Sequence, residues 1–210
     1  MMASASRYVL VPLFAAVALA APARAAQACA GYAQQLAVME EALEAVRSRV
    51  DYLAPPEDPV AARHLAQLDL VERDNTDRLA SLLGACGWPR RSVEGVEAAR
   101  RAWLVAQQRG EDLPFQRLVV RQLELAALDG EASLIHLATA SDRLAVKEGR
   151  RQRYGTQLRQ VENCTWDYYP LDELAGVEAR RKRIGLPTLE SHRRAINAMI
   201  IKENCPSSTR

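Results

Sequence analysis

The 210-residue chain has few of the residue types and patterns that mark catalytic and cofactor sites. Aromatic residues make up 5% of it and histidines number three, so few groups can stack on bases or bind metals. It has no Gly-x-Ser-x-Gly, His-Glu-x-x-His, Walker or glycine-rich dinucleotide motif. His64, His136 and His192 are expected at the surface, because none has a second ligand at metal spacing. We therefore expect no cofactor and no bound metal.

The chain also lacks an apolar run long enough to cross a membrane. The run from Tyr8 to Ala21 is too short, follows the positive Arg7 and precedes a small-residue cleavage site at Ala23–Ala25. This pattern is typical of a secretory signal peptide. A second site at Ala26–Ala28 would leave Cys29 as the first residue, which leaves a lipoprotein open. We expect a periplasmic or secreted protein with no stable membrane span after cleavage.

Neither sign of charge predominates. Loss of Arg7 and Arg24 with the signal peptide takes the basic residues from 28 to 26, against 26 acidic residues, so the mature net charge is zero. Nucleic-acid-binding proteins usually carry a basic surplus. The densest basic run, Arg180–Arg183, is too short to provide one. We expect no nucleic-acid partner, and the identity of a protein or small-molecule partner stays open.

Four cysteines, Cys29, Cys86, Cys164 and Cys205, are an even number without a CxxC pair. In the oxidising environment of an exported protein, two disulfides are expected rather than a metal site or a reactive thiol. Of the three pairings that four cysteines allow, we favour Cys29 with Cys86 and Cys164 with Cys205. These bonds would fasten each end of the chain to its body.

Apolar residues recur at steps of three and four along most of the chain, which predicts an all-α single domain of about six to seven helices. A signal peptide (1–25) precedes an N-terminal helix with a proline-rich linker (26–59) and a helical domain (60–210). Ser92 is the expected N-cap of the third helix. The pattern stops at an irregular polar turn, Tyr154–Gln157, and a short hairpin is allowed between Leu158 and Pro170. The expected helices cover about 36–53, 60–83, 93–108, 115–128, 131–148, 174–184 and 189–203.

Several polar residues fall on the apolar faces of these helices. Glu72 and Asn75 lie on the apolar side of the second helix, and Gln107 continues the apolar side of the third. Asp142 lies on the apolar side of the fifth helix, whereas Arg143 points away from it. Buried polar groups are costly unless they are hydrogen-bonded or paired. We therefore expect polar side chains from different helices to meet in one central cluster. Its expected members are Glu72, Asn75, Gln107, Asp142, Tyr154, Gln157 and Arg181.

A series of short motifs occurs in order between about Leu70 and Leu189. They are Gly87-Trp88-Pro89, Ala102–Gln107, Phe115-Gln116, Gly130-Glu131, Asp142-Arg143, Tyr154–Gln157, Arg180-Arg181 and Gly185-Leu186-Pro187. Their order and spacing resemble a bacterial family of proteins known as a domain of unknown function. Members carry Gln-His after the Ala-Trp-Leu run, whereas this chain has Gln107-Gln108. The resemblance implies the fold and the motif positions, and it brings no established activity.

The expected cluster allows more than one function. Glu72 and Asp142 are the candidate acid and base, because burial near a second carboxylate raises the pKa of one of them. The alternative is that Arg180 or Arg181 neutralises each carboxylate in a structural ion pair. The candidate ligand-binding residues are Asn75, Gln107, Tyr154, Gln157 and Arg181. We expect a binding or interaction protein of the cell envelope, and the alternatives are a hydrolase-type envelope enzyme and an immunity-type inhibitor of a secreted toxin.

Overall fold

The computed structural model describes residues 29–161 and 165–200. Within these ranges the chain forms seven helices and a two-stranded antiparallel sheet, which confirms the all-α prediction and the short hairpin. The expected signal peptide and the expected Cys164–Cys205 bond lie outside the described residues. The elements are α2 (Tyr32–Arg47), α3 (Pro59–Cys86), α4 (Val96–Ala106), α5 (Leu113–Leu128), α6 (Leu134–Lys147), β1 (Leu158–Gln160), β2 (Trp166–Tyr168), α7 (Leu174–Arg183) and α8 (Leu189–Ile200).

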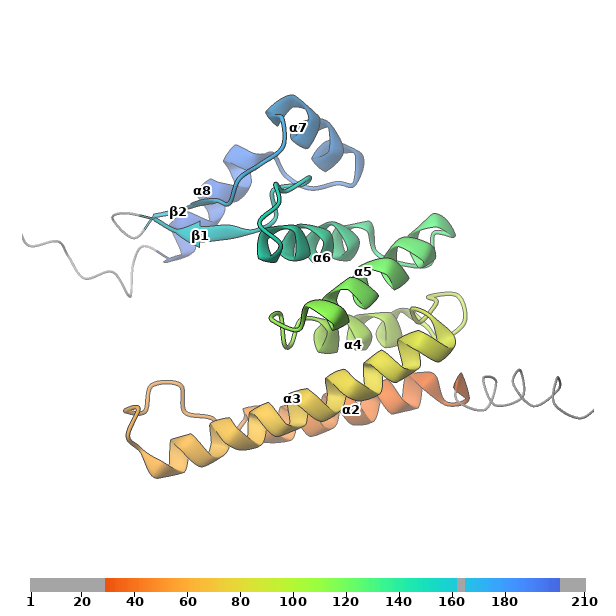
Figure 1. The fold of residues 1–210 in the computed structure, drawn as a ribbon, viewed down its shortest axis with the longest axis vertical. Helices are drawn as coiled ribbons and strands as arrows, with labels where there is room; N and C mark the ends of the chain where they lie inside the picture. Colours follow the sequence, from red (N-terminus) through yellow and green to blue (C-terminus); the bar gives the residue numbers. More distant parts are fainter. Residues whose placement is uncertain (1–28, 162–164, 201–210) are drawn as a thin grey trace, which may run out of the picture.

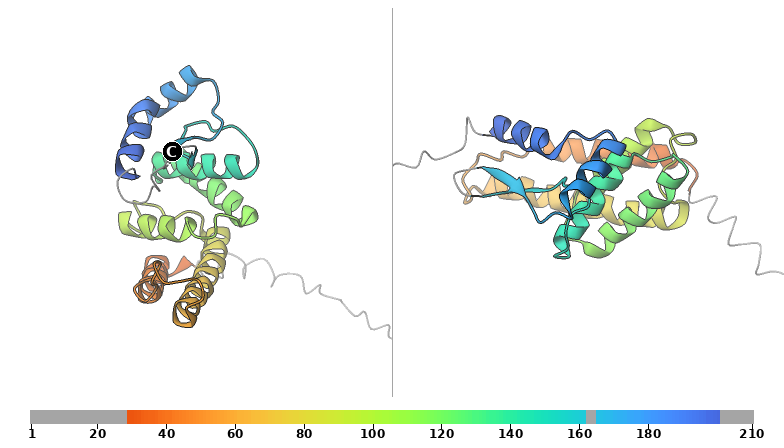
Figure 2. Two further views of the ribbon diagram at one scale, coloured as in Figure 1. Left: turned by 90° about the vertical axis from the view of Figure 1, so that its left-hand side faces the viewer. Right: turned by 90° about the horizontal axis from the view of Figure 1, so that it is seen from above.

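The helices are stacked in layers (Figures 1 and 2). α2 and α3 form a hairpin along one side of the molecule, α4 and α5 lie across it, and α6 packs on α5. The sheet, α7 and α8 lie on the far side of α6. We term the described residues from Arg150 to Ile200 the C-terminal lobe, and the helices α2 to α6 the helical body.

Apolar packing is concentrated in the helical body. Its main cluster joins side chains such as Leu36 of α2, Leu83 of α3 and Leu123 of α5, all of which are fully buried. A smaller cluster around Leu43 holds the free end of the α2–α3 hairpin. Neither cluster contains a residue of the C-terminal lobe. The lobe is therefore not part of the main apolar core of the body.

Among the helix ends that differ from the sequence prediction, the end of α2 and the start of α4 have a clear physical reason. α2 ends at Arg47, and Leu53 is 96% exposed in the loop that follows, so the prediction that the apolar stripe reaches this residue is wrong. The chain reverses here, which leaves Leu53 nothing to pack against. α4 begins at Val96, and the expected N-cap Ser92 instead donates from its amide and hydroxyl groups to the carboxylate of Glu131. Ser92 thus binds a side chain that is distant in the sequence and does not cap α4.

A disulfide joins Cys29, just before α2, to Cys86 at the end of α3, as expected. The hydroxyl of Tyr32 donates to the carbonyl oxygen of Gly87 at 3.1 Å and ties the same two segments together. Because the Cys29 sulfur is bonded to Cys86, it is not available for lipid attachment.

Replacing Cys29 and Cys86 together by serine is expected to lower the free energy of unfolding by about 3 to 4 kcal/mol. The bond spans 57 residues, and a cross-link of that separation restricts the unfolded chain strongly. Urea denaturation of the mature protein, followed by circular dichroism without reductant, measures the loss. A loss below about 1 kcal/mol would mean that packing alone holds the ends of α2 and α3 together.

Candidate functional site

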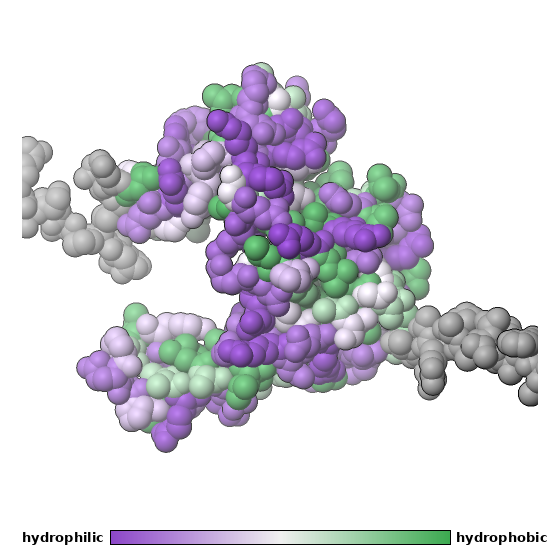
Figure 3. All heavy atoms as spheres, in the orientation of Figure 1, coloured by the Kyte–Doolittle hydropathy of each residue, from purple (hydrophilic) through white to green (hydrophobic). Residues whose placement is uncertain are grey.

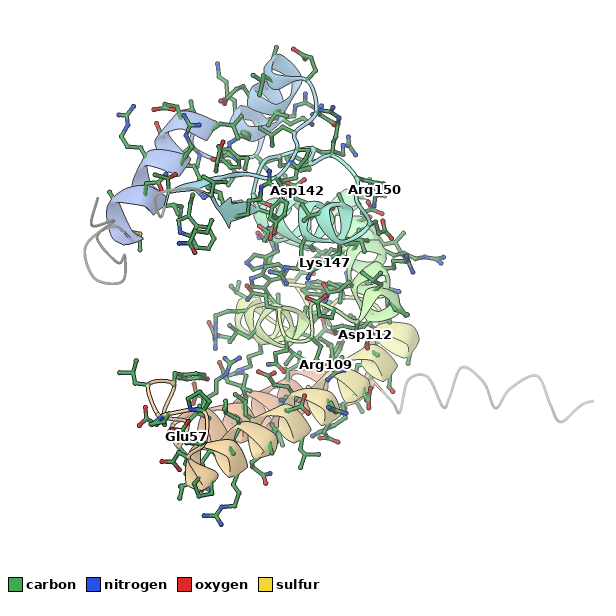
Figure 4. The ribbon with its side chains drawn as sticks, turned by 60° about the vertical axis from the view of Figure 1, so that its left-hand side comes forward. Glu57, Arg109, Asp112, Asp142, Lys147 and Arg150 are labelled. Carbon is green, nitrogen blue, oxygen red and sulfur yellow. A yellow bond between two sulfur atoms is a disulfide. The ribbon has the colours of Figure 1, made fainter. Side chains whose placement is uncertain are left out.

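Asp142 projects from α6 toward the turn formed by residues 153–157 (Figure 4). Its side chain is 0% exposed. One carboxylate oxygen, Oδ1, accepts hydrogen bonds from the amides of Arg153 at 2.8 Å and Tyr154 at 3.2 Å. The other, Oδ2, accepts from the amide and the hydroxyl of Thr156 at 2.9 and 3.1 Å. Burial raises the pKa of Asp142, and these hydrogen bonds oppose the rise.

Arg181 of α7 holds the same turn from the other side. Its guanidinium Nη1 donates to the carbonyl oxygens of Tyr154 at 2.6 Å and Gly155 at 2.8 Å. Its Nε donates to the carbonyl oxygen of Pro187 at 2.6 Å. Burial lowers the pKa of Arg181, whose side chain is 1% exposed. Asp142 and Arg181 thus bind the backbone between them, amides on one side and carbonyls on the other.

Gln152, for which the sequence offers no signal, fastens the turn to the segment before α7. Its Oε1 accepts from the amide of Gln157 at 2.7 Å, and its Nε2 donates to the carbonyl oxygens of Gln157 and Tyr169 at 3.0 Å each. The residue is fully buried. We term the group of Asp142, Gln152, Arg181 and the turn residues 153–157 the polar latch.

The polar latch contains part of the expected cluster, namely Asp142, Tyr154, Gln157 and Arg181. Glu72 lies elsewhere: it pairs with Arg47 of α2 at 3.2 Å and lines a charged cleft of about 470 Å³. The space-filling view shows a hollow with hydrophilic walls on this side of the molecule (Figure 3). Arg109 and Asp112 line the same cleft, whereas Asp142 faces the C-terminal lobe (Figure 4). The prediction of one central cluster is therefore wrong.

Asn75 and Gln107 also lie outside the polar latch. Asn75 is buried, and its Nδ2 donates to the carbonyl oxygen of Met39 at 3.0 Å, which fastens α3 to α2. Gln107 is exposed, so its predicted place on the buried face is wrong. α4 ends at Ala106, so the helical arc does not continue to Gln107, and Gln108 is buried instead.

Trp103 of α4 explains two further departures from the sequence prediction. The ring of His136 stacks on it with centroids 4.4 Å apart, and the guanidinium carbon of Arg143 lies 5.9 Å from its centre. His136 is therefore partly buried instead of fully at the surface, and Arg143 does not point away from the body. Both side chains follow the packing of α6 over α4, which helix periodicity alone does not reveal.

A pocket of about 530 Å³ opens between β2, α7 and α8 in the C-terminal lobe. We term it the C-terminal pocket. Its apolar and aromatic lining residues are Tyr168, Tyr169, Pro170, Leu171, Leu174 and Leu189, and its charged ones are Asp167, Glu178, Glu190 and Arg193. Two ion pairs link the charges, because Arg193 binds Asp167 at 3.3 Å and Glu190 at 2.7 Å.

The polar latch packs against two leucines that line the C-terminal pocket. Gly155 has a φ of 63°, and a Cβ there would lie 2.5 Å from Leu189 and 3.1 Å from Leu171, two leucines of the pocket lining. The amide of Gln152 donates to the carbonyl oxygen of Pro170 at 2.9 Å. Only glycine fits this close approach, so the turn and the pocket wall are built against each other.

Tyr168 and His192 join β2 to α8 beside the pocket. The hydroxyl of Tyr168 donates to the carbonyl oxygen of Leu189 at 2.9 Å and lies 2.9 Å from Nδ1 of His192. The hydroxyl proton is used, so Nδ1 of a neutral His192 is the donor in the second contact. Burial and the charge of Arg181 lower the pKa of His192, and its expected surface position is wrong.

Residues 30–202 match the model of DUF6624, a family of unknown function. This confirms the resemblance to a domain of unknown function. The comparisons with curated proteins and with solved structures gave no match. Across residues 29–161 and 165–200, no three His, Cys, Asp or Glu side chains are grouped so as to hold a metal ion.

Replacing Asp142 by asparagine is expected to lower the free energy of unfolding by at least about 2 kcal/mol. An amide group would face backbone donors that now bind a carboxylate oxygen, and each unsatisfied buried donor costs about 1 to 3 kcal/mol. Gln107→Leu, at an exposed position, should change stability by less than about 0.5 kcal/mol. Urea denaturation of both variants beside wild type is the measurement, and equal losses would refute the structural role of Asp142.

Stability should also fall as the pH drops from about 7 to 5. The folded protein favours neutral His192, so the stability it contributes is present above the unfolded pKa of about 6.5 and is lost as the pH falls below it. His192→Gln, which keeps a donor for Tyr168, should weaken this dependence. His136 is unchanged in both proteins, so parallel urea titrations isolate His192; identical pH slopes would contradict the assignment.

Proposed function

Because this chain belongs to the DUF6624 family, whose function is unknown, we propose a function from its geometry. The protein is an exported binding protein of the cell envelope that takes a small ligand into the C-terminal pocket.

The observation that carries this proposal is the lining of the pocket. Ligand sites are typically apolar and aromatic hollows of about 300 to 1,000 Å³ with a few polar groups that fix orientation. The C-terminal pocket has about 530 Å³, two tyrosines, three leucines and four charged side chains. The polar latch holds two leucines of this lining in place, so the pocket wall has little conformational freedom to lose when a ligand binds.

Two features support export. The Cys29–Cys86 bond suits an oxidising compartment such as the periplasm or the extracellular medium. The N-terminal sequence has the pattern of a signal peptide. Within the ranges 29–161 and 165–200, no helix is both long and apolar enough to pass through a membrane.

The enzyme alternative receives less support. Acid or base catalysis requires a carboxylate that reaches the substrate, whereas Asp142 is fully buried and both of its oxygens accept backbone hydrogen bonds. Glu72 lies in a different cleft, in an ion pair with Arg47. The two carboxylates do not share a site, which argues against their acting as a catalytic pair.

N-phenyl-1-naphthylamine, an apolar dye that fluoresces when shielded from water, is expected to bind the mature protein at one saturable site. Leu174→Gln should weaken this binding about tenfold, because it removes an apolar wall of the pocket. Leu174 is 61% exposed, so the fold should tolerate the change. A fluorescence titration gives both dissociation constants.

The matched control is Leu128→Gln at the end of α5, an 84% exposed leucine away from the pocket. It should bind the dye as wild type does. Circular dichroism verifies that both variants are folded. Absence of saturable binding by wild type, or equal binding by the two variants, would contradict the proposed site.

A further inference from the structure

Glu178 of α7 stands between two hollows. It lines the C-terminal pocket, and it also lines a second hollow of about 770 Å³ between α7 and the loop at residues 185–188. The second hollow is again mainly apolar, with Ala179, Leu186 and Pro187 in its lining, and Lys182 is the other charged side chain that lines it. A single carboxylate therefore stands where two largely apolar surfaces meet.

The charge of Glu178 has no ion-pair partner among the described residues. Its Oε1 accepts a hydrogen bond from the amide of Leu189 at 3.0 Å, and no hydrogen bond of the described residues reaches Oε2. Two other carboxylates of the pocket lining, Asp167 and Glu190, are both paired with Arg193. Among the three carboxylates of the lining, Glu178 is thus the one whose charge is not neutralised by an ion pair of the described residues.

Arg181 does not supply the missing partner. It lies one turn along α7, close enough to interact electrostatically with Glu178. Its guanidinium hydrogen bonds, however, go to the carbonyl oxygens of Tyr154, Gly155 and Pro187. Arg181 belongs to the polar latch and does not line the pocket, whereas Glu178 does.

We propose, on the basis of the binding function proposed above, that Glu178 binds an organic cation, an ammonium or guanidinium group whose apolar substituents occupy the C-terminal pocket and the adjoining hollow. A carboxylate in mainly apolar surroundings favours a cationic donor, because a charge-assisted hydrogen bond is stronger there than in water. The ring of Tyr168 in the lining also suits a cation, which is attracted to an aromatic face, whereas the ring of Tyr169 already has the guanidinium of Arg159 over it. A divalent metal is a poor fit, since it would need several oxygen ligands and this position offers one carboxylate.

Two sources share this chemistry: a free amine with an apolar chain, and a basic side chain flanked by apolar residues in a peptide. The probes are hexylammonium against 1-hexanol, and acetyl-Leu-Lys-Leu-amide against the same peptide with norleucine in place of lysine. Each probe is titrated against the complex of mature, disulfide-bonded protein with N-phenyl-1-naphthylamine, and displacement of the dye is followed by fluorescence.

At least one cationic probe is expected to displace the dye at a concentration about tenfold lower than its neutral counterpart. Glu178→Gln should remove this preference while it keeps an acceptor for the Leu189 amide. Glu124→Gln on the exposed face of α5 changes the net charge equally and should leave the preference intact. Preference for hexylammonium alone identifies a free amine as the ligand, preference for the lysine peptide alone identifies a basic peptide, and preference for both supports the shared chemistry.

Equal displacement by charged and neutral probes, or an unchanged preference in Glu178→Gln, would overturn the role of Glu178. The pocket itself would survive that result if Leu174→Gln still weakened dye binding. Failure of the dye to bind wild type would overturn both proposals together. The two failures are therefore distinguishable within one set of titrations.

Discussion

The placement of the C-terminal lobe depends on the hydrogen bonds that the carboxylate of Asp142 accepts. The apolar clusters of the helical body contain no residue of the lobe, so the lobe lies outside the main core. Asp142 accepts hydrogen bonds from three backbone amides of one turn, those of Arg153, Tyr154 and Thr156. Hydrogen bonds are directional, so this contact fixes the orientation of the turn as well as its distance from α6.

A buried charge is costly unless the protein replaces the water it loses. Here the backbone does so on both sides, with amides around Asp142 and carbonyl oxygens around Arg181. The same turn touches Leu171 and Leu189 through Gly155. The backbone stretch that solvates two buried charges therefore also supports two leucines of the C-terminal pocket.

The helices could be predicted from the sequence because their apolar residues recur at the helical period. The site could be predicted only in part, because periodicity gives the face of a helix and not the neighbour that this face meets. Asn75 and Asp142 both lie on apolar faces, yet one binds the backbone of α2 and the other a turn of the lobe. Gln152 and Glu178 carry no sequence signal, since a glutamine in a loop and a glutamate on a helix are ordinary surface residues until the lobe folds around them.

The latch also bears on the charge that the pocket presents. Arg181 follows Glu178 by three residues on α7, close enough for the two charges to interact. Three hydrogen bonds to carbonyl oxygens hold the guanidinium of Arg181 in the polar latch, and Asp142 lies near enough to offset part of its field. The bonds that stabilise the turn thereby use the donors of Arg181 on backbone carbonyls, so the structural role of Arg181 and the binding role proposed for Glu178 involve separate charges on the same helix.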